Sequence, residues 1–179
     1  MAAVTAPTID EFATQLIAED ELGSVMRAHL HIEHHMDQLV EAMVVHPPAL
    51  KRLNLDFAGK VHLLEALGVS KELTAPLLGL GSVRNRFAHR LNCKLTKDMM
   101  RDFYRSLGKD GKQVMQQSYA RLRKVNHHPK DIWALEPKMV FSLLASTIRI
   151  QVLLALKEQT GEFPAGSVPP RFEASKVCG

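Results

Sequence analysis

Apolar residues recur every three or four positions along most of the chain, which is the spacing of amphipathic helices. The longest such pattern begins at Ile9 or at Glu19 and ends near Val45. Pro47 and Pro48 follow it, and proline stops a helix because it donates no backbone hydrogen bond. The apolar face of this pattern carries Leu22, Val25, Met26, Ile32, Met36, Leu39, Val40 and Met43. The sequence lacks alternating β-branched runs and tight hairpin turns, so we expect an all-α fold.

Four shorter segments show the same spacing and have residues typical of helix ends at their limits. They cover residues 56–67, 96–107, 112–125 and 137–160. Gly68 and Thr96 are the predicted caps of the first two segments, and Pro137 suits the first turn of the last one. Together with the long first pattern, these segments predict a bundle of about five to seven helices.

Residues 70–91 give a mixed signal. Ser70 is a suitable N-cap for a helix, and Glu72 lies in what would be its first turn. Pro76, Gly79 and Gly81 follow within the same stretch, and all three have low helix propensity. We therefore predict a broken helix here, which resumes near residue 82.

The segment 137–160 is apolar on nearly every side. It contains the longest apolar stretch of the chain, from Met139 to Leu156. Arg149 and Gln151 lie inside that stretch, and a membrane span rarely contains both. We therefore predict a buried helix of the core or of a subunit interface, and we expect no membrane partner.

Length and composition fit one globular domain with a tail. The chain has 179 residues, of which 46% are hydrophobic and 23% are charged. We expect residues 1–160 to form a single helical domain and residues 161–179, which are rich in proline and glycine, to form a flexible tail. The N-terminus lacks the features of a secretory signal. Cys93 and Cys178 are too few for a disulfide framework or a cysteine zinc site, so we expect reduced thiols, a cytoplasmic location and no cofactor.

The net charge of +4 is concentrated in one segment. Residues 108–131 contain six cationic and two acidic side chains. Two interpretations stay open, a solvated helix face and a surface that contacts phosphate groups. For the second, the predicted nucleic-acid-binding residues are Lys112, Arg121, Arg123 and Lys124 of this segment, with Arg86 and Arg90 from the motif described next.

The densest set of reactive side chains lies in residues 84–90, which read RNRFAHR. An imidazole such as His89 can take a proton from a ribose 2′-hydroxyl and return one, and the guanidinium of Arg84 can bind a phosphate in bidentate fashion. Asn85 can orient either group through hydrogen bonds. This chemistry needs no metal. The alternative is a basic surface turn in which Phe87 and Ala88 pack inward.

This motif resembles the HEPN superfamily, whose signature is R-x4-6-H with a polar residue, often Asn, after the arginine. The surroundings are similar to the mannitol operon repressor branch and to related HEPN-like domains. The matching features are the run Phe57-Ala58-Gly59-Lys60, the turn Leu67-Gly68, and the motif from Arg84 to His89. The resemblance covers about residues 22–91.

The resemblance implies an α-helical bundle that dimerises, with the two Arg-His motifs facing each other. Many HEPN domains are metal-independent endoribonucleases, and others are binding or regulatory modules without activity. By this resemblance Arg84, Asn85 and His89 are the catalytic residues, and RNA or a protein is the expected partner. The alternative is a non-catalytic regulatory adaptor that acts in transcription through protein contacts. One toxin branch carries a tyrosine two residues after the histidine; this chain has Leu91 there, so regulation through that tyrosine is not expected.

Histidines and one glutamate interrupt the apolar face of the first long helix. His29 and Glu33 are four residues apart and therefore stack on one helix face. A carboxylate in that position needs a partner. Either the two residues satisfy each other, or Glu33 orients Arg84 as a supporting residue of the site.

His31 and His35 have the same i, i+4 spacing, which suits a metal site. No third ligand follows at a telling distance, so we predict no metal site. The sequence also lacks a P-loop, a nucleophile elbow and a helix-turn-helix reader of DNA. These absences argue against a P-loop ATPase, an α/β-hydrolase and a direct DNA-sequence reader.

Overall fold

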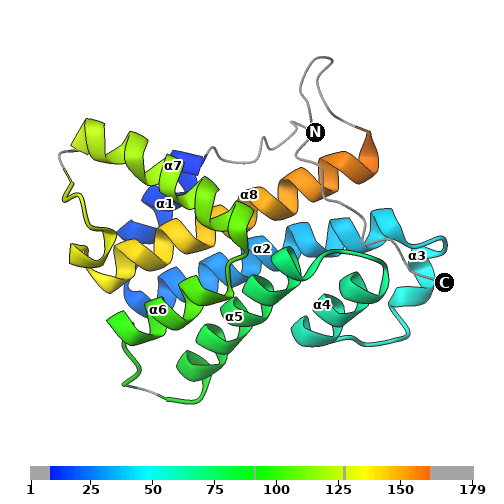
Figure 1. Cartoon of the computed structure of the whole chain (residues 1–179). Helices are drawn as coiled ribbons and strands as arrows, with labels where there is room; N and C mark the ends of the chain where they lie inside the picture. The colour runs from blue at the N-terminus through cyan, green and yellow to red at the C-terminus, as the bar shows by residue number, and fades with distance from the viewer. Residues whose placement is uncertain (1–8, 91, 127, 162–179) are drawn as a thin grey trace, which may run out of the picture.

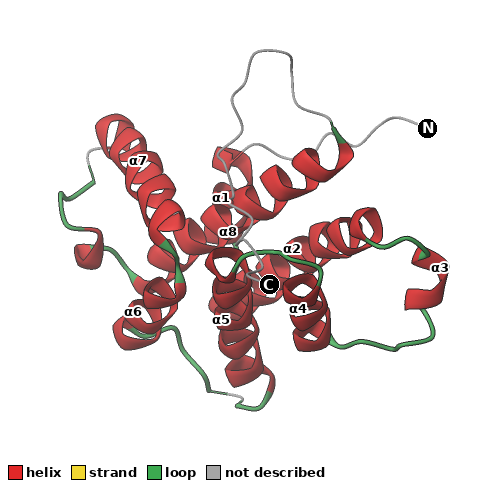
Figure 2. Cartoon of the chain, turned by 45° about the vertical axis from the view of Figure 1, so that its right-hand side comes forward, coloured by secondary structure: helices red, strands yellow, loops and turns green. Residues whose placement is uncertain are grey.

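The computed structural model describes residues 9–90, 92–126 and 128–161, and it is helical throughout (Figure 2). These residues form eight α-helices and one short 3-10 helix, and they contain no strand, which confirms the predicted all-α class. The elements are α1 (Ile9–Ala18), α2 (Glu21–Met43), α3 (Pro47–Leu50), α4 (Phe57–Ala66), α5 (Lys71–Ala88), α6 (Lys97–Ser106), α7 (Lys109–Asn126), η1 (Ile132–Ala134) and α8 (Pro137–Thr160). The number of α-helices is higher than the predicted five to seven, because the first pattern forms two helices and the one-turn α3 follows them.

The core lies around α2 and α8, which run side by side through the molecule (Figure 1). Helix α1 packs against both, and α5, α6 and α7 pack against α8. Phe12, Ile32, Met36 and Phe141 are fully buried at these contacts. The helix predicted to be central from its apolar surface is therefore a core helix.

By length and composition α8 is apolar enough to cross a membrane, and it is the one such helix among the described residues. Within its most apolar window, 67% of the helix is buried inside the protein, as expected for a core helix. Arg149 is 2% exposed there, and its guanidinium carbon lies 4.9 Å from the centre of the Phe12 ring. Burial lowers the pKa of Arg149 below its ordinary value.

The first long pattern divides between α1 and α2, which settles where the second helix begins. Asp20 caps α2, and its carboxylate accepts a hydrogen bond from the Gly23 backbone N–H at 2.6 Å. The Ser24 hydroxyl donates to the Leu16 carbonyl, which ties the two helices together across the break. Both starting points considered for the pattern, Ile9 and a position near Glu19, therefore begin a helix.

Helix α5 is continuous from Lys71 to Ala88, so the predicted break is wrong. A Cβ at Gly79 would lie 2.9 Å from the Phe103 ring, and a Cβ at Gly81 would lie 3.1 Å from the Phe57 ring. The two glycines thus allow α6 and α4 to approach α5 closely. Pro76 is buried in the same helix. Tertiary packing overrides the low helix propensity of this segment.

The other predicted helix limits agree closely with the structure. Thr96 accepts a hydrogen bond from the Met99 N–H, and Gly68 follows α4 with a φ of 98°. Helix α7 begins at Lys109, three residues before the predicted residue 112, because the Glu72 carboxylate accepts hydrogen bonds from the N–H groups of its first turn. Of the predicted tail, residues 162–179 lie outside the described residues.

Candidate functional site

A cavity of about 670 Å³ opens between α2, α4 and α5, and we call it the Arg-His cavity. It brings together most of the predicted site. Its lining includes the three predicted catalytic residues, the two supporting residues and two of the predicted basic residues: Arg84, Asn85, His89, His29, Glu33, Arg86 and Arg90. Segments that are far apart in the sequence therefore supply one site.

The end of α5 presents the motif to this cavity. His89 follows the last helical residue as the C-cap, and its backbone N–H donates to the Asn85 carbonyl at 3.2 Å. On an ideal helix Arg84 and His89 point about 140° apart, yet both line the same cavity. Phe87 is buried at 7% exposure, whereas Ala88 is exposed, so only the phenylalanine packs inward.

Arg84 is half-buried, and part of its hydrogen-bonding capacity is unused. One terminal nitrogen donates to the Asn85 side-chain oxygen at 3.1 Å. The Nε atom is buried and has no hydrogen-bond partner among the described residues. A buried donor of this kind is satisfied when an acceptor such as a phosphate oxygen binds beside it.

No hydrogen bond or ion pair joins Glu33 to Arg84 among the described residues, so the predicted orientation of the arginine by Glu33 has no direct contact behind it. Its carboxylate pairs with Lys60 Nζ at 2.9 Å and lies 3.5 Å from His29 Nδ1. Lys60 also pairs with Asp37 at 2.7 Å. The carboxylate on the apolar face therefore has two partners, of which the sequence analysis found one, His29.

Lys60 of α4 was not predicted as a site residue; it does not line the cavity itself, but it pairs with Glu33, which does. Burial alone would lower the pKa of Lys60, but hydrogen bonds and charges from Asp37 and Glu33 raise it above its ordinary value. The ammonium group therefore stays charged and binds the carboxylates of Glu33 and Asp37 on α2. A half-buried glutamate such as Glu33 needs a cation beside it, and this requirement could have pointed to a partner such as Lys60.

His29 forms a buried part of the cavity wall. It is 5% exposed, and its ring lies 4.3 Å from the ring of Phe57. Burial lowers the pKa of His29; Glu33 raises it, and the positive charges of Arg84 and Lys60 lower it further. The imidazole is therefore neutral at pH 7, and its neutral ring suits contact with an aromatic neighbour.

The other histidines of α2 are not arranged as metal ligands. In the part of the chain that the structure describes, no three His, Cys, Asp or Glu side chains are placed to hold a metal ion. His31 lies edge-on to Phe12, with ring centres 5.4 Å apart. His35 and His34 both approach the amide of Gln38, at 3.3 and 3.4 Å. Burial lowers the pKa values of His31 and His35.

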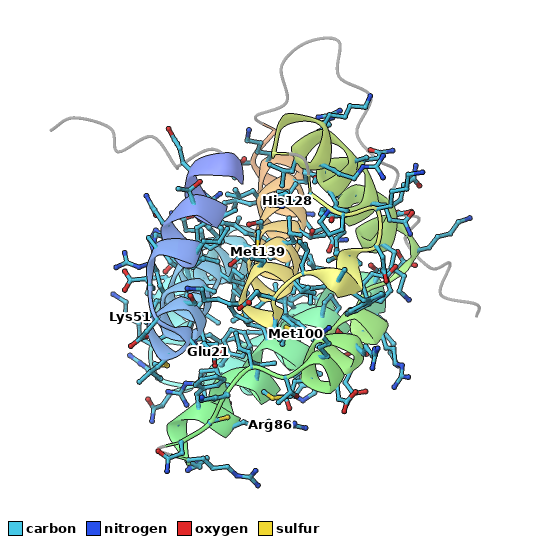
Figure 3. The ribbon with its side chains drawn as sticks, turned by 90° about the vertical axis from the view of Figure 1, so that its left-hand side faces the viewer. Glu21, Lys51, Arg86, Met100, His128 and Met139 are labelled. Atoms are coloured by element: carbon cyan, nitrogen blue, oxygen red, sulfur yellow. The ribbon has the colours of Figure 1, made fainter. Side chains whose placement is uncertain are left out.

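The predicted basic residues of α7 lie apart from the Arg-His cavity. None of them lines it. Figure 3 shows Arg86 near one end of the molecule and His128, just beyond α7, towards the other. Arg123 lines a different cavity, Lys112 packs against Tyr104, and both Arg121 and Lys124 are exposed. The structure therefore separates the predicted basic residues into two groups.

The chain was compared with family models, curated proteins and solved structures, and none of them matches it. The site described above is consequently defined by its own residues and geometry, within an all-α protein.

Proposed function

We propose that this protein is a HEPN-like, metal-independent endoribonuclease that acts in the Arg-His cavity. The observation that carries the proposal is that Arg84, Asn85 and His89 line one cavity. Its volume of about 670 Å³ lies within the range of roughly 300–1,000 Å³ that is typical of sites for small ligands, so a nucleotide of an RNA strand fits.

His89 is the proton-transfer group in this mechanism. It is exposed at the end of α5, where its imidazole can reach a ribose. As a general base it takes the proton of the 2′-hydroxyl while the 2′-oxygen forms a bond to phosphorus. The bond between phosphorus and the 5′-oxygen then breaks, and the imidazolium returns the proton to that oxygen. The products are a 2′,3′-cyclic phosphate and a 5′-hydroxyl end.

Arg84 binds the phosphate and stabilises the charge that develops on it. Its buried Nε donates to one non-bridging oxygen, and a terminal nitrogen donates to another. Asn85 fixes the opposite side of the guanidinium through the hydrogen bond at 3.1 Å. Arg86 and Arg90 line the same cavity and attract the adjoining phosphates of the strand.

Glu33, Lys60 and His29 act as positioning residues rather than as proton-transfer groups. The Lys60–Glu33 ion pair joins α4 to α2, and His29 packs between Glu33 and Phe57. These contacts fix the α2 and α4 side of the cavity, which Arg84 of α5 also lines. Their removal should change the alignment of the site more than its charge.

A second copy of the chain completes the proposed enzyme. Leu22 and Leu30 are 50% and 61% exposed on α2, the helix that also carries His29 and Glu33 into the cavity. Exposed leucines on such a helix are typical of a face that another protein covers. A two-fold dimer formed through this face would bring two Arg-His cavities together.

The test is cleavage of a mixed RNA pool in the presence of EDTA. Wild type should produce fragments with 2′,3′-cyclic phosphate ends, identified by mass spectrometry. His89→Ala should reduce the rate about 10²- to 10⁴-fold, as expected for loss of a general acid–base, and Arg84→Ala should reduce it by a similar factor. His62→Ala and Arg105→Ala replace exposed residues outside the cavity and should retain full activity.

A regulatory adaptor is the second candidate, and a separate observation favours it. Val45 and Leu53 are 101% and 58% exposed on the segments flanking α3, at the end of the molecule labelled α3 in Figure 1. Such side chains suit a protein partner. If folded wild type leaves several RNAs intact at high concentration, the endoribonuclease proposal is wrong and the adaptor explains the chain better.

A further inference from the structure

A second cavity, of about 340 Å³, lies between α6, α7 and η1, and we call it the aromatic cavity. The chain has one tryptophan and two tyrosines, and all three line this cavity: Trp133, Tyr104 and Tyr119. It shares no residue with the Arg-His cavity. The flat polar aromatic rings of the chain are therefore gathered at one place that the proposed enzyme does not use.

The rings are held in fixed positions. Tyr104 and Trp133 meet edge to face, with ring centres 5.5 Å apart and planes at 90°. Tyr119 is 7% exposed, and its hydroxyl donates to the Pro129 carbonyl at 2.7 Å. Met115, at 1% exposure, also lines the cavity. The cavity is thus preorganised, which lowers the ordering cost of binding a flat ring.

Cationic groups surround these rings. Arg123 and Lys130 line the cavity, while Lys112 Nζ lies 5.5 Å from the centre of the Tyr104 ring. Arg101 places its guanidinium carbon 5.9 Å from the centre of the Trp133 ring. The acidic lining residue, Asp131, already accepts a hydrogen bond from the Trp133 backbone N–H at 3.0 Å. The local charge therefore favours an anion.

The same charges argue against the other ligand that aromatic cavities bind, a quaternary ammonium group. Such a cation is drawn to the negative face of an aromatic ring, and it binds weakly where other positive charges lie close by. Here Arg123 and Lys130 line the cavity, and Lys112 and Arg101 lie near its rings, so these four side chains would repel a further positive charge. A ligand with a flat ring and a negative group fits both features of the site.

We propose that the aromatic cavity binds a nucleotide, with the base stacked among Tyr104, Tyr119 and Trp133 and the phosphate beside Arg123 and Lys130. Bases stack on aromatic side chains with little sequence preference, and guanidinium and ammonium groups bind phosphate. The same chemistry is offered by a free nucleoside monophosphate and by a nucleotide within single-stranded RNA. The proposal does not depend on cleavage, because none of these residues lines the Arg-His cavity.

Trp133 is the single tryptophan of the chain, so its fluorescence reports on this cavity directly. The full chain is titrated with AMP, with a short single-stranded RNA and with choline, under excitation selective for tryptophan. We expect saturable quenching by AMP or by the RNA, and the tighter of the two identifies the source of the nucleotide. Absence of quenching by both, or tighter binding of choline than of either, would overturn the proposal.

Variants locate the binding. Tyr104→Ala retains the reporter and should weaken binding roughly 5- to 150-fold, the range expected for the loss of one stacking partner. The double variant Arg123→Ala, Lys130→Ala should weaken AMP more than adenosine, which lacks the phosphate. Lys124→Ala replaces an exposed cation of α7 that does not line the cavity and should bind like wild type.

Arg84→Ala and Lys124→Ala serve as controls for where the nucleotide binds. Circular dichroism confirms that each variant is folded. Arg84→Ala should leave quenching unchanged, because Arg84 does not line the aromatic cavity. Failure of the endoribonuclease and failure of the nucleotide site can therefore be told apart. If Lys124→Ala weakens binding as much as the double variant does, the charge of the whole helix rather than the cavity binds the ligand, and the proposal fails.

Discussion

The Arg-His cavity and the aromatic cavity lie on different parts of one bundle and are lined by different chemistry. The first contains the histidines His29 and His89, the carboxylate of Glu33 and the guanidinium of Arg84. The second contains tyrosines, the tryptophan and cations, and the described residues that line it include no histidine. The first cavity therefore presents imidazole and carboxylate groups, which are the usual general acids and bases, whereas the second presents flat rings and cations, which suit a flat anionic ligand.

The difference shows that basic residues predicted to bind one nucleic acid need not serve one site. The cations of the motif in α5 are placed beside groups that can carry out a reaction. Lys112 and Arg123 of α7 are placed beside aromatic rings instead. The partners of each cation, and not the net charge of the chain, thus indicate what each region can bind.

The largest expected effects come from measuring both RNA cleavage and Trp133 quenching on one variant of each cavity. His89→Ala should lower RNA cleavage about 10²- to 10⁴-fold and leave the Trp133 quenching curve unchanged. Tyr104→Ala should weaken quenching and leave kcat for a dinucleotide unchanged, because such a substrate is too short to occupy both cavities. If one substitution impairs both measurements in a folded protein, the two cavities form a single site.

The next effect concerns Glu33 and the wall of the Arg-His cavity. Glu33→Gln removes the charge that holds Lys60, so the site is misaligned and kcat should fall about 10-fold with little change in KM. Glu41→Gln changes an exposed glutamate of the same helix and should have no effect. Equal and negligible effects of both substitutions would reject a positioning role. Nucleotide binding at the aromatic cavity should be unaffected by either one.

A smaller effect is expected at the contact between α5 and α6. Gly79→Ala places a Cβ 2.9 Å from the buried Phe103 ring and 2.8 Å from Ser106 Oγ, so the helices must move apart. Overpacking costs about 1–3 kcal/mol, which exceeds the gain of up to about 1 kcal/mol in helix propensity. Urea unfolding should therefore show a lower free energy of unfolding. Gly81→Ala, which meets the half-buried Phe57 at 3.1 Å, should cost less.

The smallest effect is a pH dependence of the free energy of unfolding that arises from three histidines of α2. Burial lowers the pKa values of His29, His31 and His35 in the folded state, whereas the unfolded value is about 6.5. As the pH drops through about 6.5, the unfolded chain binds more protons at these histidines than the folded chain does, so the free energy of unfolding falls. Well above pH 6.5 these histidines are neutral in both states and do not affect the free energy of unfolding.

This dependence is measured by thermal unfolding between pH 8 and pH 5. His35→Gln should reduce the slope, because glutamine does not titrate. His62→Gln changes an exposed histidine of α4 and should leave the slope as in wild type. Equal slopes for wild type and His35→Gln would show that His35 is not a cause of the pH dependence.

Local sequence signals predicted most of the fold. The caps at Thr96 and Gly68, the start of α8 at Pro137 and most of the apolar stripe of α2 depend on residues close in sequence, and they appear as predicted. Leu22 is the exception in that stripe, because it is 50% exposed. The break in α5 was wrong because Gly79 and Gly81 are explained by contacts with α6 and α4, which no local pattern contains.

The candidate site was predicted in part for the same reason. The motif from Arg84 to His89 is local, and so is the His29–Glu33 pair at 3.5 Å. The Lys60 partner of Glu33 is 27 residues away, and Trp133 meets Tyr104 only after the chain has passed through α7. Contacts between such distant residues follow from the packing of helices and not from spacing along the sequence.

Helix α5 forms contacts on two sides, since Gly79 admits α6 and Gly81 admits α4. In evolutionary terms, a substitution in α5 that adapts one cavity also changes the surroundings of the other. A larger side chain at position 79 would push α5 away from α6 and would also shift the Arg-His motif, which begins five residues further along the same helix. Changes that adapt either cavity should therefore accumulate on α2, α4, α6 and α7, while the two glycines of α5 remain.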